Sequence, residues 1–511
     1  MNKFEAMKAA KDGLDVWEDI LRYARERTPI EEIPPDDLDR MKWYGVFHRR
    51  LTPGFFMMRL RISGGRLFAH QAEVLADIAQ AYGRGTVDIT TRQNIQLRWL
   101  TLDVIPDIIA RLETAGISTL QTGMDNLRNY VSCPLNGVDA GEVIDTRPIL
   151  EELAELHLGR KEYSNLPRKF NFSITGCRED CGQAQTQDLG LLPAIRGAGS
   201  GAVLGFNVLV GGSLGGTSPK LAEPMDVFVE PHQVARFVLA VLRVFRDHGP
   251  REVRTKTRIR WLIAEWGMER FRAAVEAAFG EPLPRQGRHL TARVAGDHLG
   301  VRPERVRGMY SVGLHVPVGR MTAAQLRELA RLARRYGTGE IRLTNDQNAV
   351  LVHVHRLYLD RLLAEPLLEE LSPRPSPIWK NLVVCTGNDY CHFSLIDTKN
   401  RAVELARQLE ARGITLPEGT RIHISGCINA CGKHPVADIG LEGTKVRVGD
   451  EQVEAAHVFV GGKLGLGCGR IARTFRKDVT FDELPLVIAE ARDELRRLDT
   501  QPALQAGEVV A

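Results

Sequence analysis

The sequence predicts a mixed α/β (α+β) fold that arose by tandem duplication of one unit. Two observations lead to this prediction. Long segments recur at a nearly constant spacing, and in each copy short strands alternate with helices of about 10 to 15 residues. The chain has 511 residues, of which 43% are hydrophobic, so it can form several domains with buried cores.

Two blocks of sequence reveal the duplication. The first begins at Gly65 and at Gly319, and its two versions are GRLFAHQAEVLADIAQAYGRGTVDITTRQNIQL and GRMTAAQLRELARLARRYGTGEIRLTNDQNAVL, with matching positions 254 apart. The second begins at Ile174 and at Ile424, and its versions are ITGCREDCGQAQTQDLGL and ISGCINACGKHPVADIGL, with a spacing of 250. Two long blocks at nearly one spacing indicate two copies of one unit.

The elements of the first copy follow from hydrophobic periodicity. Residues 55–62 and 87–100 are predicted to be strands, with a helix over residues 69–83 between them. Residues 168–174 alternate with period two, and residues 421–425 do the same in the second copy. The prolines and glycines between Pro282 and Gly300 predict the boundary between the copies.

Composition excludes several classes of function. The net charge is +4, from 68 basic and 64 acidic residues, which is too balanced for a nucleic-acid-binding protein. No apolar run reaches the length of about 18 residues that a membrane span needs. The charged, amphipathic N-terminus MNKFEAMKAAKDGLDVWEDILRYARER lacks the features of a secretion signal. We therefore expect a cytoplasmic protein with reduced thiols, whose clustered cysteines serve metal binding or catalysis.

Four cysteines of the second copy form two pairs. Cys385 and Cys391 are separated by five residues, and Cys427 and Cys431 by three. Four thiolates in a glycine-rich context favour a 4Fe–4S cluster. A structural zinc site, which usually has shorter spacings within each pair, and buried cysteines without a function are the alternatives.

The C-x5-C and C-x3-C pairs, the duplication and the segment TTRQNIQ together resemble the sulfite and nitrite reductase family, which couples siroheme to a 4Fe–4S cluster. The resemblance extends from about Trp43 to about Phe475. It implies a three-part architecture with the cofactors at the pseudo-twofold interface of the copies. It also implies that Cys431 bridges the cluster and the siroheme iron. The expected segments are an N-terminal helical arm (1–50), two ferredoxin-like half-domains (51–125 and 300–370), a siroheme- and anion-binding half (126–290) and a half that binds the 4Fe–4S cluster and siroheme (371–511).

Polar and cationic side chains follow three predicted strands of the first copy. Solvated strand faces are the plain alternative, but the second copy lacks these cations, because Gly313, Asp346 and Gly419 stand where the first copy has Arg59, Arg92 and Lys169. This asymmetry favours a bipartite site, with a cationic pocket in one copy and the cluster in the other. The resemblance implies that substrate contacts Arg59, Arg128, Lys169 and Asn171, that siroheme contacts Arg61, Thr90, Arg92, Asn94, Gln96 and Cys431, and that Cys385, Cys391, Cys427 and Cys431 bind the cluster.

The resemblance implies an assimilatory six-electron reduction of nitrite to ammonia, with Lys169 as the expected proton donor. Sulfite-reducing relatives carry lysine at the position of Asn171, and some carry a Tyr–Cys crosslink where this chain has Phe47 and Gly123. Sulfite reductase, a precorrin-3B-synthase-like enzyme and a non-catalytic iron–sulfur electron carrier are the alternatives. Because no GxGxxG motif is evident, the expected donor is ferredoxin or flavodoxin rather than a pyridine nucleotide.

Several residues remain outside these assignments. Cys133, Cys177 and Cys181 match Cys385, Cys427 and Cys431, and the fourth position falls near Asp139, which predicts a vestigial site and one cluster per chain. Cys468 is expected to be a packed residue without a function. The basic residues Arg470, Arg473, Arg476 and Lys477 form either a docking patch for an acidic donor or a solvated helix face. We expect a monomer.

Overall fold

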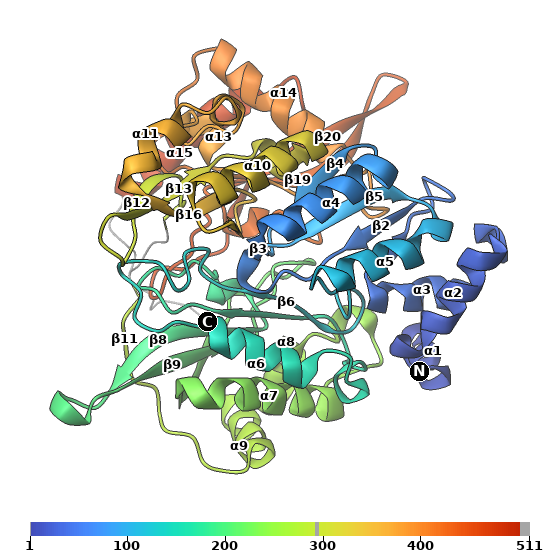
Figure 1. Cartoon of the computed structure of the whole chain (residues 1–511), viewed down its shortest axis with the longest axis vertical. Coiled ribbons are helices and arrows are strands. Elements are labelled where there is room, and N and C mark those ends of the chain that lie inside the picture. Colours follow the sequence, from blue (N-terminus) through green and yellow to red (C-terminus); the bar gives the residue numbers. More distant parts are fainter. Residues whose placement is uncertain (1, 292–295, 501–511) are drawn as a thin grey trace, which may run out of the picture.

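The computed structural model describes residues 2–291 and 296–500, which form four sheets in two related pairs (Figure 1). The predicted α/β class and the duplication are confirmed, since each pair contains one sheet from each copy. Residues 292–295 of the predicted boundary lie outside the described residues. Among the described helices, none combines the length and the apolar composition of a membrane span.

The first pair of sheets exchanges edge strands between the copies. The sheet of the first copy has the order β1 (Val46–His48), β2 (Phe56–Arg59), β5 (Ile95–Leu100), β4 (Thr86–Ile89) and β14 (Arg320–Thr322). The sheet of the second copy has the order β12 (Gly300–Pro303), β13 (Met309–Leu314), β16 (Ala349–His355), β15 (Glu340–Leu343) and β3 (Arg66–Phe68). Each sheet therefore ends on a strand from the other copy.

Two glutamines reinforce this exchange. Gln93 donates from Nε2 to the carbonyl of Leu343 (3.0 Å), and Gln347 donates from Nε2 to the carbonyl of Ile89 (2.9 Å). Both are buried and both have positive φ angles, of 55° and 66°. Because the four residues are related by the repeat spacing, these hydrogen bonds are equivalent under the pseudo-twofold relation.

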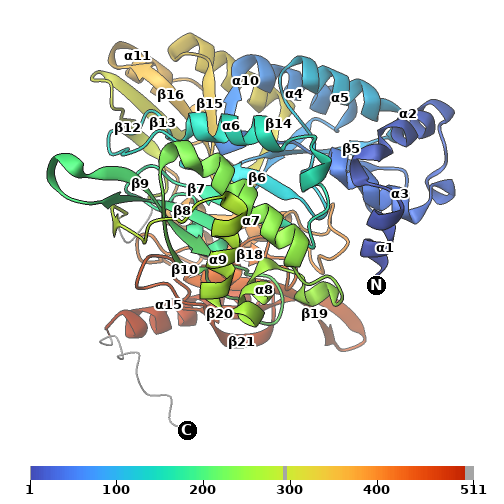
Figure 2. The same cartoon turned by 90° about the horizontal axis from the view of Figure 1, so that it is seen from below.

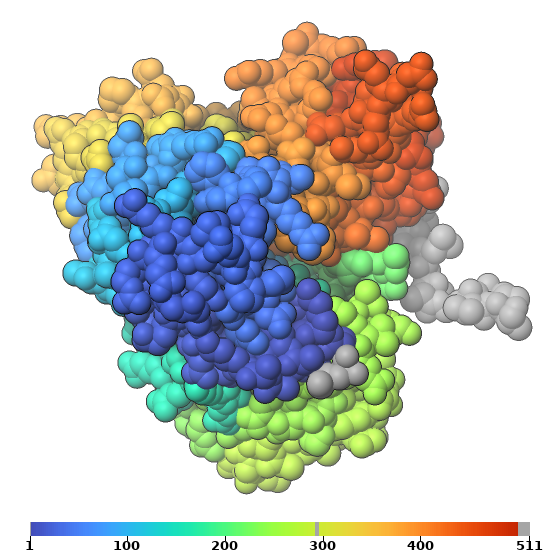
Figure 3. Space-filling view, turned by 90° about the vertical axis from the view of Figure 1, so that its right-hand side faces the viewer, coloured from blue at the N-terminus to red at the C-terminus, as the bar shows by residue number. Residues whose placement is uncertain are grey.

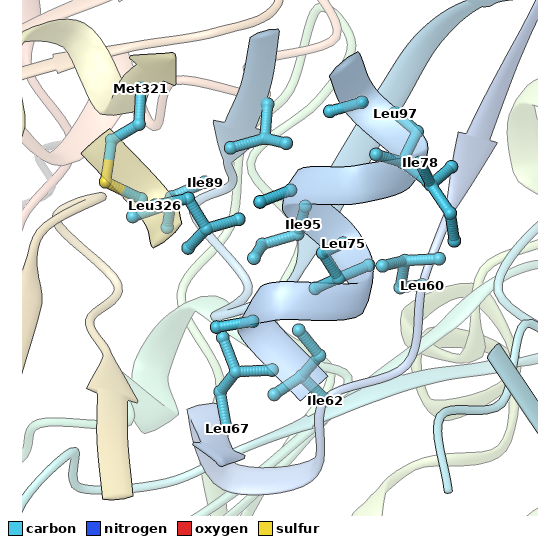
Figure 4. Close-up of a cluster of buried hydrophobic side chains, with 14 of the residues drawn as sticks. Leu60, Ile62, Leu67, Leu75, Ile78, Ile89, Ile95, Leu97, Met321 and Leu326 are labelled. Atoms are coloured by element: carbon cyan, nitrogen blue, oxygen red, sulfur yellow. The ribbon is translucent and has the colours of Figure 1, made fainter. Parts of the chain in front are cut away.

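Helices α4 (Ala69–Tyr82) and α10 (Ala323–Tyr336) lie side by side across the first pair of sheets (Figure 1). Figure 4 shows Leu75 and Ile78 of α4 among Leu60, Ile95 and Leu97, in a cluster that Met321 and Leu326 of the second copy also enter. Apolar packing thus joins the copies into one core. The neighbouring helices are α5 (Ile105–Thr114), α11 (Arg356–Leu363) and α12 (Leu367–Glu370).

The second pair of sheets carries the cysteines. In the first copy the order is β10 (Glu223–Val229), β9 (Val203–Val210), β8 (Leu189–Arg196), β7 (Phe170–Ile174) and β6 (Leu127–Val131), and β11 (Arg288–His289) pairs with β8. In the second copy it is β17 (Leu382–Val384), β18 (Ile422–Ser425), β19 (Ile439–Val448), β20 (Glu451–Val460) and β21 (Arg473–Thr480). In each copy the two strands that precede the cysteines are parallel.

Helices cover these two sheets. In the first copy they are α6 (Arg147–His157), α7 (Val234–His248), α8 (Ile259–Trp266) and α9 (Met268–Phe279), of which α7 and α9 lie in front of the sheet in Figure 2. In the second copy they are α13 (Pro377–Lys380), α14 (Thr398–Ala411) and α15 (Leu484–Thr500). Each sheet has its own apolar core.

The N-terminal segment contains α1 (Lys3–Ala10), α2 (Trp17–Glu26) and α3 (Pro35–Arg40), which appear in blue on the face shown in Figure 3. Trp43 is fully buried and donates from Nε1 to the carbonyl of Ser164 (2.9 Å). Lys8 donates to the carbonyl of Leu166 (2.8 Å) and lies 3.2 Å from Asp125. These helices therefore pack directly on the first copy.

One predicted element is wrong in an informative way. Residues 87–100 form not one strand but the hairpin β4–β5, with a turn from Thr90 to Asn94. The hydroxyl of Thr90 donates to Asn94 Oδ1 (2.5 Å) and accepts from the amide of Arg92 (3.2 Å), which closes the turn. The side chains of 90, 92 and 94 therefore surround a turn instead of lining one strand face.

Candidate active site

The four cysteines of the second copy lie beyond the carboxyl ends of two parallel strands. Cys385 follows β17, whereas Cys427 and Cys431 follow β18, and the ends of parallel strands meet at one edge of a sheet. The amide of Cys385 donates to the carbonyl of Ile424 (3.0 Å), which fixes the first loop against the second strand. Cysteines from two loops that are separate in the sequence therefore lie at the same edge of the sheet.

The surroundings of these thiols suit a buried metal cluster. Burial raises the pKa of Cys385 to about 11 and that of Cys391 to about 12, and it also raises the pKa of Cys427. The backbone amide of Gly426 donates to Cys385 Sγ (3.2 Å). Metal binding deprotonates such thiols, and amide donors to sulfur are typical of cluster sites. The residues present therefore fit a 4Fe–4S cluster.

The hairpin turn of the first copy lies against these cysteine loops. The hydroxyl of Thr91 donates to the carbonyl of Cys431 (3.0 Å), and the hydroxyl of Thr386 donates to Gln96 Oε1 (3.1 Å). The two copies thus meet at Cys431, the cysteine that is most exposed of the four. Asn94 and Gln96 are both buried at this interface.

Arg59 and Arg128 converge on a single carbonyl beside this interface. Both guanidinium groups donate from Nη1 to Thr122, at 3.1 Å for Arg59. Burial lowers the pKa of Arg59 to about 10, with a further contribution from Arg92, and burial and Arg59 lower the pKa of Arg128. Two desolvated cations held this close strongly favour an anion between or beside them.

Arg92 and Lys169 complete the cationic group without partners of their own. Within residues 2–291 and 296–500, the guanidinium of Arg92 and the ammonium of Lys169 make no hydrogen bond or ion pair. Burial holds the pKa of Lys169 well below its usual range, and Arg258 and Arg92 lower it further, whereas Cys431 raises it. Lys169 thus lies within the electrostatic reach of both the cations and Cys431.

Strand β7 presents a polar face to the same region. Asn171 and Ser173 alternate with Phe170, Phe172 and Ile174, which enter the core of the sheet. Asn171 Oδ1 and Ser173 Oγ are buried and have no hydrogen-bond partner among the described residues. Arg128 Nε is in the same condition. Buried polar atoms are normally satisfied, so these atoms mark a place for a ligand.

Arg61 has a different environment from the other cations. Its guanidinium donates to four backbone carbonyls, namely those of Leu120, Gln121, Leu127 and Arg128. The side chain is buried, and its charge is used to hold the segment that carries Arg128. This arrangement favours a positioning role over the expected contact with siroheme.

Two residues near the site were not identified from the sequence. Thr91 was missed because only alternate positions of the supposed strand were considered. Lys433, two residues after Cys431, has its pKa lowered to about 8 by burial, and it lies within reach of Arg92 and Asp346. A lysine two residues after a cysteine of the C-x3-C pair is the sequence signal that could have revealed it.

The pocket also fits siroheme. This macrocycle carries eight carboxylates and binds an anionic substrate, so it needs fixed cations and donors. The structure provides four half-buried cations within electrostatic reach of one another, the unsatisfied atoms on β7 and Arg128, and the thiol of Cys431, which acts on the pKa values of Arg59, Arg92 and Lys169. Cys431 lies where the two halves of a coupled site would have to meet.

A thiol-lined edge in one copy and a cationic pocket in the other define a class of two-part redox protein. Sequence comparison identifies its family. The profile "Nitrite and sulphite reductase 4Fe-4S domain" matches residues 123–283 and 379–493, and the profile "Nitrite/Sulfite reductase ferredoxin-like half domain" matches residues 48–115 and 302–368. The chain belongs to the nitrite and sulphite reductase family.

Individual relatives resemble the chain along almost its whole length. It is 45% identical to a ferredoxin–nitrite reductase of Synechococcus elongatus and 38% identical to an assimilatory ferredoxin-dependent nitrite reductase of Haloferax mediterranei. These alignments cover 96% of this chain, and 96% and 88% of the relatives. The solved structure of the NirA protein of Mycobacterium tuberculosis matches with a TM-score of 0.89 and 31% identity, over 99% of this chain and 95% of that one.

Proposed function

We propose that this protein reduces nitrite to ammonium, using siroheme and one 4Fe–4S cluster and taking electrons from ferredoxin. The observation that carries the proposal is the contact of the two copies at Cys431, where the thiol edge meets the cationic pocket. Near-complete similarity to nitrite-reducing relatives supports the same conclusion. The balanced reaction takes one nitrite, six electrons and eight protons to one ammonium and two waters.

The cofactors would be held by residues of both copies. Cys385, Cys391, Cys427 and Cys431 would bind the cluster, and Thr90, Arg92, Asn94 and Gln96 would hold the carboxylates of siroheme. When bound, siroheme supplies an iron atom for the nitrogen of nitrite, and the cluster supplies single electrons.

The cations of the pocket bind and orient the substrate. Arg59 has a pKa of about 10, so it stays charged near neutral pH, and with Arg128 it stabilises the negative charge of nitrite. The side-chain amide nitrogen of Asn171 can donate to a nitrite oxygen. Its buried oxygen, which has no partner among the described residues, can accept a hydrogen bond from the ligand.

Lys169 is the proton donor in this proposal. A buried ammonium among cations gives up its proton more readily than a solvated one, and its pKa is lowered by these causes. Because arginine does not release its proton near neutral pH, Arg59 and Arg128 cannot take this role. In this proposal the two arginines bind the anion with permanent charges, and Lys169 donates the proton.

Two features favour nitrite over sulfite. With Asn171 in place of a lysine, the pocket has one positive charge fewer. This lower charge suits a monoanion better than a dianion. The crosslink of some sulfite-reducing relatives cannot form, because Phe47 and Gly123 occupy those positions. They lie directly against each other, since a Cβ atom on Gly123 would be 2.8 Å from Phe47 Cζ.

The donor would reach the cluster from the surface of the second copy. Arg473 and Arg476, which belong to the expected docking patch, lie on strand β21 instead of a helix and pair with Glu494 and Glu490 of α15. This pairing leaves Lys477 as the more available charge of the strand. Exposed Phe393 (61%) and Ile428 (41%) flank the cluster cysteines and offer apolar contact area. We place the enzyme in the cytoplasm as a monomer.

Spectra and turnover together test the proposal. The purified protein is expected to show the Soret and long-wavelength bands of siroheme, and to convert nitrite to ammonium with reduced ferredoxin at a higher kcat/KM than sulfite to sulfide. Iron–sulfur absorption without siroheme bands would indicate an electron carrier instead. Siroheme bands with a preference for sulfite would keep the family and reject the substrate.

A further inference from the structure

The first copy holds a second group of cysteines at the edge equivalent to the cluster edge. Cys133 follows β6, and Cys177 and Cys181 follow β7, which is parallel to β6. All three are buried, and their sulfur atoms lie within 4.8 Å of one another. The pocket residues that bind substrate and siroheme in the proposed function do not include them.

A histidine from the linker between the copies supplies a fourth donor. His298 Nε2 lies 3.3 Å from Cys181 Sγ and 3.8 Å from Cys133 Sγ, and the Cys177 and Cys181 sulfurs are 3.4 Å apart. The repeat alignment places the fourth position near Asp139, so the sequence pattern does not predict a donor that comes from the linker. An imidazole thus lies beside two of the three thiols, and the carboxylate of Glu179 lies within 4.8 Å of the donor atoms of Cys181 and His298.

The distances from His298 to Cys181 and Cys133, and from Cys177 to Cys181, are those between ligands of one tetrahedral metal ion. Four ligands at tetrahedral angles around zinc have sulfur atoms about 3.8 Å apart and sulfur-to-nitrogen distances of about 3.5 Å. An iron–sulfur cluster binds each thiolate to a different iron, so its cysteines are spread farther apart. Among the described residues, no group of metal-binding side chains as compact as this one includes Cys385, Cys391, Cys427 or Cys431.

A nearby positive charge also suits a metal ion that is bound by thiolates. The buried His298 side chain lies within the field of Arg302, whose positive charge would balance the excess of thiolate charge.

We propose that Cys133, Cys177, Cys181 and His298 bind one zinc ion in a closed Cys3His site. Soft thiolates with one imidazole in tetrahedral geometry select zinc, and four protein ligands leave no position for substrate. The site is structural, and it is independent of the proposed nitrite chemistry.

The ion would fasten the linker between the copies. His298 lies just before β12, and its carbonyl packs so tightly on β13 that a Cβ atom on Gly313 would come within 1.8 Å of it. Asn345 of the second copy donates to the carbonyl of Cys181 (2.6 Å). One ion would therefore connect two loops of the first copy, the linker and, through Asn345, the second copy.

Metal analysis of the purified holoenzyme tests this proposal. We expect about one zinc per chain in addition to the iron of the cofactors. X-ray absorption at the zinc edge observes zinc alone, whatever siroheme and cluster are present. It is expected to show three sulfur ligands at about 2.3 Å and one nitrogen at about 2.0 Å.

Matched variants identify the ligands. Cys181→Ser and His298→Ala are expected to lower zinc at least about tenfold while siroheme absorption is kept. Cys468→Ala, which removes a cysteine outside the group, is expected to keep both. Absence of zinc from the unmodified protein, with Cys177 and Cys181 joined as a disulfide after denaturation in alkylating agent, would overturn the proposal. A zinc spectrum with only oxygen and nitrogen ligands would overturn it as well.

Discussion

The two cysteine-bearing edges of the molecule share one frame but differ in how far apart they hold their donors. In the second copy the loop after β17 carries two cysteines, Cys385 and Cys391, and the loop after β18 carries the other two. In the first copy the loop after β6 carries Cys133 alone among the matched cysteines, and a linker histidine completes the group.

The difference shows how duplicated sheets acquire separate chemistry. Parallel strands bring two loops to one edge in both copies, so the topology alone creates a place for ligands. In the assignments proposed above, the number of donors in the first loop decides between a cluster and a single ion. The cationic residues are divided in the same way, because they line the interface from the first copy and are absent at equivalent positions of the second.

Exchanging Cys431 for serine, and separately its repeat counterpart Cys181, gives the largest expected contrast. Cys431→Ser is expected to lower nitrite reduction by more than about 100-fold and to perturb the siroheme spectrum, since oxygen is a poor ligand for soft iron centres. Its counterpart Cys181→Ser is expected to keep siroheme and about four non-haem irons per chain. Equal loss of the cofactors in both variants, or about eight such irons in the native protein, would contradict the distinction between the edges.

Lys169, which matches Gly419 of the second copy, tests the cationic side. Lys169→Gln is expected to lower kcat about 100-fold, which is the scale of general acid catalysis. Because the folded pKa is lowered, the native lysine carries its proton only below that pKa, so activity is expected to fall as pH rises through it. The variant is expected to lose this alkaline limb.

Lys169→Arg separates charge from proton donation. It keeps a cation but cannot release a proton near neutral pH, so it is expected to bind nitrite with an almost native KM and still lack kcat. A native kcat in this variant would show that Lys169 serves only as a charge.

Substitutions of Asn171 test the charge balance of the substrate pocket, with a smaller expected effect. Asn171→Lys adds a fourth cation beside Arg59, Arg128 and Lys169, which favours a dianionic substrate. The ratio of kcat/KM for sulfite to that for nitrite is expected to rise about tenfold, equivalent to about 1.4 kcal/mol of differential transition-state binding. Asn171→Asp, which adds a negative charge, is the control and is expected to lower this ratio. If the ratio changes in the same direction in both variants, the charge at position 171 does not determine selectivity.

The smallest effect concerns donor docking on the outer strands. Arg473 of β21, which pairs with Val460, stands where β10 has Glu223, which pairs with the equivalent Val210. Charge reversal by Lys477→Glu is expected to raise the KM for reduced ferredoxin a few fold at low ionic strength, and added salt is expected to reduce this difference. The same charge reversal at an exposed residue of the first copy, Arg196→Glu at the end of β8, is expected to leave KM unchanged, and a KM independent of salt would contradict electrostatic docking.

Most helices and strands considered above could be predicted from the sequence, because they depend on local periodicity or on the repeat. The helix expected at residues 69–83 is α4, and the strands expected at residues 168–174 and 421–425 are β7 and β18. The prediction of one strand over residues 87–100 is wrong because a tight turn closed by Thr90 and Asn94 preserves the alternation of polar and apolar positions. Periodicity cannot distinguish such a hairpin from one long strand.

Contacts between residues that are far apart in the sequence could not be predicted from it. Arg61 has the charge of a cofactor ligand, and only its four carbonyl partners indicate a positioning role. His298 is 117 residues away from Cys181 and has no counterpart in the repeat pattern. The reciprocal exchange of β3 and β14 was also invisible, since strand order depends on contacts between segments that sequence spacing does not relate.

The exchanged strands impose an order on biosynthesis. The edge of β4, which ends at Ile89, pairs with β14, which begins at Arg320, 231 residues later. At a ribosomal rate of about 5 to 20 residues per second, that partner is synthesised about 10 to 50 s after β4. During this interval the nascent first sheet presents an unpaired strand edge, which is a site for aggregation or for chaperone binding. Neither copy can complete its own sheet, so insertion of the cofactors at the interface must await an almost full-length chain.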